Sequence, residues 1–424
     1  MPKTTDDVQA STRVPALSAV AGTLSGMGQQ RQPLFDDFER TDATPSTHQE
    51  SSFEFLNRIA GDYWEHPRAL MQEWLRRIPN ELEYNDLRQR FRSRDDEQFR
   101  SAFLEVYLHE GLIRAGYTVT IHPEVEGTGR RPDFLAQRDD VRFFIEAIAP
   151  GSAPAEKAAA QRRAVLFDTV NRLGDPNFML WLDELVEGSS SPASARLRSD
   201  LRRWLVDLDP DAPWDPEAAP TRRWEHDGWA VTFRAIPKKP EARGARPNDR
   251  AIGVYGHTGA GFIDDAPAIQ KALATKHHEY GNLGAPFIIA VGTYIHDRDR
   301  WHSGNAMYGH VAVQIGEAPD GSTVTREVRQ PDGYFGTPPE WANRNVSGVL
   351  VVNQLMPYHV QRAETTLWRH PDPIHELPEV VGLPGDTLSL VGNGLVEVQA
   401  LTGAGQYFGL PDVWPPGEPW PDGE

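Results

Sequence analysis

The stretch Arg131-Pro132-Asp133-Phe134, followed by Phe143-Phe144-Ile145-Glu146-Ala147, decides the fold that the sequence predicts. Both segments have strand-forming residues, and the polar run 137–140 between them supplies a turn. A two-residue turn at Asp139 and Asp140 would place Asp133 directly opposite Glu146, on one face of a sheet. A slip of one residue would send Glu146 to the other face.

Two carboxylates that face each other across a hairpin require a physical reason. Like charges opposite each other destabilise a strand pair, and the usual reasons for such a pair are a bound cation or a shared proton. The pair of Asp133 and Glu146 therefore predicts a divalent-metal site, and a solvated hairpin face is the alternative.

The composition narrows the class of protein. With 424 residues, 39% of them hydrophobic, the chain is long enough for two domains or for one domain enlarged by insertions. The absence of cysteine excludes disulfides, thiolate metal sites, iron–sulfur clusters and cysteine nucleophiles. The formal net charge of −18 argues against general attraction to nucleic acid or to an anionic membrane, but one basic groove remains compatible with it.

The sequence predicts a soluble, cytoplasmic protein. No apolar run reaches the roughly 18 residues of a membrane span, and the best candidate, Pro286–Ile295, is typical of a buried strand. Residues 1–10 contain Asp6 and Asp7 without a basic cluster, and 14–24 is only weakly apolar, so we expect no cleaved signal.

The pattern along the chain predicts four regions. Residues 1–50 are polar and expected to be disordered, and 51–94 form a helical extension with helices at 51–77 and 80–92. The core is expected over 95–355, with an insertion at about 151–262, and 356–424 is expected to be a loop-rich, Pro-rich tail. Within the core and insertion we expect helices at 95–115, 155–173, 191–206 and 265–280, strands at 117–125, 177–185, 229–236, 287–294 and 346–355, a linker at 210–220, and loops at 296–345.

A third acid precedes the hairpin. Glu105 lies in the helix expected at 95–115, where its neighbours one turn away include Ala102 and Leu108. A carboxylate in a largely apolar neighbourhood must be paired, hydrogen-bonded or metal-linked if it is buried, and a surface glutamate is the alternative.

The order of these parts resembles the core of the PD-(D/E)xK nuclease superfamily, the restriction-endonuclease-like fold. The resemblance covers 95–150 well: a helix with Glu105, a strand, a strand that begins with Pro132-Asp133, and a strand with Glu146. It implies an α/β fold with a mixed central sheet. It also implies that Asp133, Glu146 and Glu105 bind Mg²⁺ or Mn²⁺, which activates water to attack a phosphodiester.

The main departure from this family is the lysine expected two residues after the second acid. Ile148 occupies that position. Some members supply the ammonium from a helix, which leaves Lys157, directly after the hairpin, and Lys276, before the strand at 287–294. We favour Lys276, because its helix precedes a central strand and because the pair of Lys276 and Tyr280 resembles a helix motif of some relatives. A lysine there would stabilise negative charge that develops during attack on phosphate.

Several other signals are weaker. The basic loop 238–250, and Arg130 with Arg131, fit phosphate contacts or ordinary surface positions. The pair His277-His278 lacks the spacing of a zinc-binding helix, and the Gly-rich segment 256–261 lacks the features of a phosphate loop. Trp301, near His302, is a candidate ligand contact.

The function predicted is metal-dependent hydrolysis of DNA in restriction, repair or defence, with nucleic acid and a second copy of the chain as partners and no membrane contact. One alternative is a catalytically inactive nuclease fold that serves as a binding or assembly module, which Ile148 and the acidic net charge favour. Another is a metal-dependent hydrolase of a small phosphorylated substrate. Residue types alone do not separate DNA from RNA.

Overall fold

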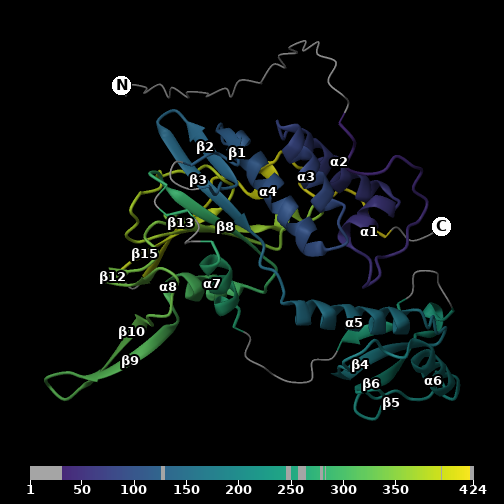
Figure 1. Cartoon of the computed structure of the whole chain (residues 1–424). Helices are drawn as coiled ribbons and strands as arrows, with labels where there is room; N and C mark the ends of the chain where they lie inside the picture. Colours follow the sequence, from purple (N-terminus) through teal and green to yellow (C-terminus); the bar gives the residue numbers. More distant parts are fainter. Residues whose placement is uncertain are drawn as a thin grey trace, which may run out of the picture. The chain divides into compact units, whose positions relative to one another are not determined.

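The N-terminal part of the chain forms four helices (Figure 1). The computed structural model describes residues 31–125, 129–244, 250–255, 264–276, 280–281, 283–392 and 394–420, and residues 33–424 belong to one unit. The segments 1–30, 256–261 and 277–278, about which the sequence made predictions, lie outside the described residues. In contrast to the expected disorder up to residue 50, Leu34 and Phe35 are buried in the core.

The helix expected over 51–77 is two helices, α1 (Ser52–Arg58) and α2 (Asp62–Arg76). The chain turns between them at Gly61, which has φ +107°, a conformation that favours glycine. The helices α3 (Glu81–Phe91) and α4 (Asp96–Arg114) follow close to their expected bounds, with Asn80 and Asp95 as N-caps. Gly116 follows α4 with φ +84°.

A mixed sheet of eight strands forms the centre of the described structure. Its spatial order is β1 (Thr118–Ile121), β2 (Phe134–Arg138), β3 (Val141–Ile148), β8 (Phe287–Thr293), β13 (Gly348–Asn353), β14 (Glu364–Arg369), β15 (Asp386–Val391) and β16 (Gly394–Val398). The pairs β3/β8, β8/β13 and β14/β15 are parallel, and the other neighbours are antiparallel. The expected α/β class with a large mixed sheet is therefore confirmed.

The hairpin of β2 and β3 has the predicted register. Its pairs run from Phe134 opposite Ile145 to Arg138 opposite Val141, with Asp139 in the turn at φ +51°. Extending this register by one residue brings Asp133 opposite Glu146, as the two-residue turn predicts.

The two faces of the sheet are covered by different helices. Alternate residues of β3 belong to different hydrophobic clusters, Phe143 and Ile145 with the side of α1–α4, and Phe144 with the side of α7 (Ala266–Ala274) and α8 (Trp301–Tyr308). Figure 1 shows these helix groups on opposite sides of the sheet. Every residue of β8 is buried, as expected for a central strand between two layers. Glu146 lies two residues after Phe144 in β3, so it shares the face of Phe144 and α7.

The residues between β3 and α7 form a second sheet with its own core, within the expected insertion. Its elements are α5 (Pro154–Asn171), β4 (Phe178–Val186), α6 (Ser194–Val206), β5 (Thr221–His226), β6 (Trp229–Pro237), the short helix η1 (Pro240–Ala242) and β7 (Ile252–Tyr255), with strand order β5-β6-β4-β7. The sequence analysis missed β5, although Asp227-Gly228, both at positive φ, form the turn of a β5–β6 hairpin.

Two segments expected to be rich in loops contain regular structure. Between 296 and 345 lie η2 (Arg298–Arg300), α8, and the pairs β9 (Val311–Glu317) with β10 (Thr323–Arg329) and β11 (Gly336–Thr337) with β12 (Glu340–Trp341). Residues 356–424 contribute β14–β16 to the large sheet. The same region also contains η3 (Val360–Arg362) and α9 (Ala404–Tyr407). The prolines that made this region resemble a tail all lie outside these strands.

Among the described residues, no helix combines the length and the apolar character that a membrane crossing requires.

Candidate functional site

The site is built around Glu146, a carboxylate on β3 that is only 2% exposed. Its Oε1 lies 2.6 Å from Nζ of Lys276, which follows α7. Its Oε2 accepts a hydrogen bond of 2.7 Å from the hydroxyl of Tyr280 and one of 3.3 Å from the backbone N–H of Asp133. The structure thus brings together Asp133, Glu146 and Lys276, three of the residues predicted from the sequence.

Asp133 is bound to the strand that carries Glu146. Its Oδ2 accepts a hydrogen bond of 2.7 Å from the backbone N–H of Ala147, while its own N–H points to Glu146. Each carboxylate is therefore fixed by the backbone of the opposite strand, which offsets part of their repulsion. This arrangement holds two acids side by side at the open end of the hairpin.

His122, just after β1, contacts Asp133 from the other side. Its backbone N–H donates to the carbonyl of Asp133 at 2.9 Å, and its Nε2 lies 3.5 Å from Oδ1 of the same residue. Its Nδ1 lies 3.0 Å from Oε2 of Glu83 on α3. The hydrogen bond to Asp133, more than that to Glu83, raises the pKa of His122 to about 9, against the effect of burial. A cation thus stands beside Asp133.

The surroundings of Glu146 favour its protonated form. Burial, and next the negative charge of Asp133, raise the pKa of Glu146 to about 7, while the hydrogen bonds from Lys276 and Tyr280 act in the opposite direction. A buried carboxylate whose pKa lies near 7, beside a second carboxylate, is typical of functional sites. It is also a position where a cation would relieve unfavourable charge.

Glu105 lies close enough to interact electrostatically with Asp133, but its carboxylate is bound to an arginine. Arg90 on α3 donates to both oxygens, at 2.5 and 2.9 Å. Burial is the main factor that raises the pKa of Glu105, Arg90 lowers it, and the charge of Asp133 raises it further. Glu105 is thus a largely buried carboxylate whose partner is Arg90, and its role in metal binding stays a prediction.

Lys157 is placed elsewhere. It lies near the start of α5, where its ammonium pairs with Asp95 and Glu97 at the beginning of α4. Of the two lysines considered in the sequence analysis, Lys276 is the one that contacts Glu146. Arg131 pairs with Glu124 at 2.7 Å and is half exposed.

The donor set suits magnesium. No group of three or more His, Asp or Glu side chains within the described ranges is arranged to hold a metal ion. Magnesium, however, commonly binds through one or two carboxylates and takes its other ligands from water and phosphate. Asp133 and Glu146 supply two carboxylates whose mutual repulsion a cation would reduce. Asp133 and Glu146 therefore fit the ion. The carboxylate of Glu105 is bound to Arg90 instead.

Sequence reasoning missed His122 and Glu83. A histidine after a short strand carries no distinctive pattern, and Glu83 lies on α3. Only the fold brings His122 to Asp133 and Glu83 to His122. Tyr280 entered the prediction only with Lys276, as part of a helix motif. The helix α7 ends at Ala274, before both residues, and their side chains nevertheless both bind Glu146.

No protein-family model, no curated protein and no solved structure matches this chain.

Proposed function

We propose that this chain is a metal-dependent nuclease that hydrolyses phosphodiester bonds of DNA. The observation that carries the proposal is the constellation around Glu146: a buried acid beside Asp133, with the ammonium of Lys276 at 2.6 Å. The order α4, β1, β2, β3, α7, β8, with β3 parallel to β8, supports it, because the PD-(D/E)xK resemblance implies this succession. Restriction, repair and defence remain the candidate settings, and self-association as a homodimer belongs to the same proposal.

The proposed roles follow from the contacts. Asp133 and Glu146 would hold Mg²⁺ or Mn²⁺. The bound ion would lower the pKa of a coordinated water and neutralise charge on the phosphate. Lys276 places a positive charge beside Glu146, where it would stabilise negative charge on the attacked phosphate. Tyr280 orients Glu146 through its hydroxyl, and His122 orients Asp133 through backbone and ring contacts.

The test is cleavage of plasmid and single-stranded DNA with Mg²⁺ or Mn²⁺, comparing wild type with Asp133→Asn and Glu146→Gln. Each substitution keeps the shape of the side chain and removes a ligand charge, so we expect a loss of activity of about 100-fold or more. Asp139→Asn in the turn of the same hairpin is the control, because asparagine tolerates the positive φ of that position. Unchanged cleavage by both site variants would contradict the proposal.

A catalytically inactive binding module is the second candidate. Ile148, which stands where the nuclease family has a lysine, and the formal net charge of −18 favour it. In that case wild-type protein would bind DNA without cleaving any substrate, with or without divalent metal. A hydrolase of a small phosphorylated substrate would instead release inorganic phosphate from a chromogenic phosphoester and leave DNA intact.

A further inference from the structure

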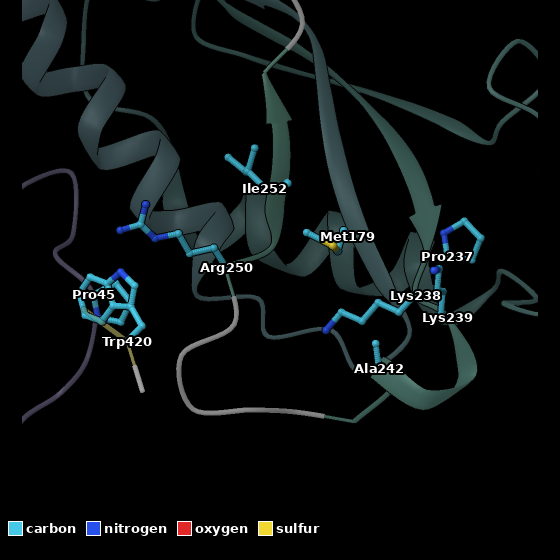
Figure 2. A pocket seen from close by; sticks show the side chains of 10 residues that line it. Pro45, Met179, Pro237, Lys238, Lys239, Ala242, Arg250, Ile252 and Trp420 are labelled. Carbon is cyan, nitrogen blue, oxygen red and sulfur yellow. The ribbon is translucent and has the colours of Figure 1, made fainter. Parts of the chain in front are cut away.

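A pocket with a basic lining lies beside the second sheet (Figure 2). None of its lining residues belongs to the site around Glu146. Its volume is about 820 Å³. It is lined by Pro45, Met179, Pro237, Lys238, Lys239, Ala242, Arg250, Ile252, Gly253 and Trp420. In Figure 2 the two lysines lie on one side, and Arg250, Pro45 and Trp420 lie on the other.

The charge of the lining is of one sign. Of its ten described residues, three are basic and none is acidic. The second basic pocket of this sheet differs, because Asp200 and Glu225 belong to its lining. A concave site with several cations and no lining carboxylate is suited to an anion.

The basic residues are carried by a fixed backbone. The N–H of Lys238 donates to the carbonyl of Asn177 at 2.7 Å, and the short helix η1 follows directly. Arg243, at the end of η1, pairs with Asp211 at 2.7 Å. Arg250 donates to the carbonyl of Ser46 at 2.6 Å. These contacts hold the backbone at Lys238 and the guanidinium of Arg250 before any ligand arrives.

On the side of Arg250, Trp420 supplies an aromatic surface. Its ring is 43% exposed, and it contacts the rings of Trp64 and Phe55, with centroid distances of 5.4 and 6.3 Å. The indole of Trp64 also donates to the carbonyl of Pro419 at 3.1 Å, which anchors the neighbouring residue. An anchored and partly exposed tryptophan beside a cationic lining is the combination that binds single-stranded nucleic acid, by stacking a base and neutralising its phosphate.

The charge distribution along the chain points the same way. Residues 151–262 contain 16 Lys and Arg and 16 Asp and Glu, so the whole formal charge of −18 belongs to the remaining residues. A polyanion therefore meets less repulsion at this insertion than elsewhere along the chain.

We infer that this pocket binds a nucleotide unit of a single-stranded nucleic acid, with phosphate at Lys238 and Lys239 and, on the facing side, a base against Trp420 with Arg250 beside it. The inference rests on the proposed nuclease function. It names single-stranded nucleic acid as the class of ligand that this pocket binds. The same chemistry would accept a free nucleotide, so both sources are compared in the test.

The experiment measures binding of a fluorescein-labelled dT12 oligonucleotide by anisotropy, in EDTA so that no cleavage occurs. Lys238→Gln combined with Lys239→Gln should weaken binding about 10-fold at moderate salt, and should reduce the slope of log K against log salt by about 1.4. Trp420→Leu should weaken binding and leave the salt slope unchanged, because stacking involves no counterion release.

The matched control is Arg198→Gln combined with Arg202→Gln on α6, which removes the same charge outside the pocket. If it weakens binding as much as the lysine pair does, or if the lysine pair binds dT12 as wild type does, the inference is overturned. Competition by unlabelled dTMP at concentrations comparable to dT12 would assign the pocket to a free nucleotide, whereas competition by oligonucleotide alone would assign it to a strand.

This binding assay is independent of cleavage. A protein that binds dT12 through Lys238 and Lys239 but never cleaves DNA would refute the nuclease proposal and keep the pocket. Cleavage that depends on Glu146, with binding indifferent to the lysine pair, would refute the pocket and keep the nuclease.

Discussion

Glu146 is held by residues from both sides of the insertion, since Asp133 precedes the insertion and Lys276 and Tyr280 follow it. The sequence order of Asp133 and Glu146 was enough to predict their pairing, because one turn fixes the register of the hairpin. The choice between Lys276 and Lys157 was not predictable in the same way. It depends on parallel pairing of β3 with β8, which no local pattern encodes.

We predict that Lys276→Met lowers DNA cleavage about 100-fold, because it removes the positive charge beside the reacting phosphate. Initial rates of plasmid nicking under saturating Mg²⁺ would measure the effect. Lys157→Met is the matched control, since Lys157 pairs with Asp95 and Glu97. Equal losses in the two variants would contradict the assignment of Lys276.

We predict that His109 makes stability depend on pH. Burial, and next the charge of Arg77, lower its pKa to about 4. Between pH 4 and about 6.5 the unfolded chain binds a proton at this residue that the folded chain does not bind. The free energy of unfolding should therefore fall as the pH is lowered through this window, by roughly 3 kcal/mol in total from this residue.

Denaturant unfolding of wild type and His109→Leu at pH 7 and pH 4 would measure this contribution. The variant should lose less stability on acidification than wild type does, because leucine has no proton to bind. Identical losses in the two proteins would show that His109 does not contribute.

At the scale of elements, capped helices and the apolar central strands were predicted close to their bounds, whereas β5 and β14 to β16 were not predicted. The helices α3 and α4 have polar caps at Asn80 and Asp95 that the sequence displays. The strands β14 to β16 lie in the region assigned as a Pro-rich tail, although β15 and β16 pair as neighbours along the chain. The turn at Asp227-Gly228 is the clearest signal that was overlooked, since Asp-Gly between strand-forming residues is a strong hairpin signature.

We predict that Gly309→Ala, between α8 and β9, destabilises the protein by about 3 kcal/mol. Its φ is +85°, and an added Cβ would lie 2.0 Å from the carbonyl oxygen of Gln330. Gly316→Ala in β9 is the control, because nothing lies within 4 Å of the Cβ there. Thermal unfolding would measure both, and equal melting temperatures for the two variants would contradict the prediction.

At the scale of the whole molecule, Asp168 joins the insertion to the segment that precedes α1. It lies on α5 and is 2% exposed. It accepts hydrogen bonds from the backbone N–H groups of His48 and Gln49, at 2.7 and 3.1 Å, and from the side chain of Gln49. Nothing in the sequence indicated this contact, because the polar composition of the segment predicted disorder.

We predict that Asp168→Ala costs about 3 kcal/mol of stability, because it leaves buried N–H groups without an acceptor. It should also expose residues 33–50 to proteolysis, which limited trypsin digestion with mass spectrometry would detect. Asp207→Ala, at the exposed end of α6, is the control and should leave both properties unchanged. Resistance of residues 33–50 in the Asp168 variant would contradict a joining role.

The pairing of β3 with β8 across the insertion has a consequence for biosynthesis. During translation β3 leaves the ribosome well before β8, and a long flexible segment between them would make their closure costly in entropy. An insertion with its own core can fold first, which shortens the flexible chain between β3 and β8. Glu146 lacks both Lys276 and Tyr280 until the insertion has been synthesised, so the site cannot be assembled when its first two acids emerge.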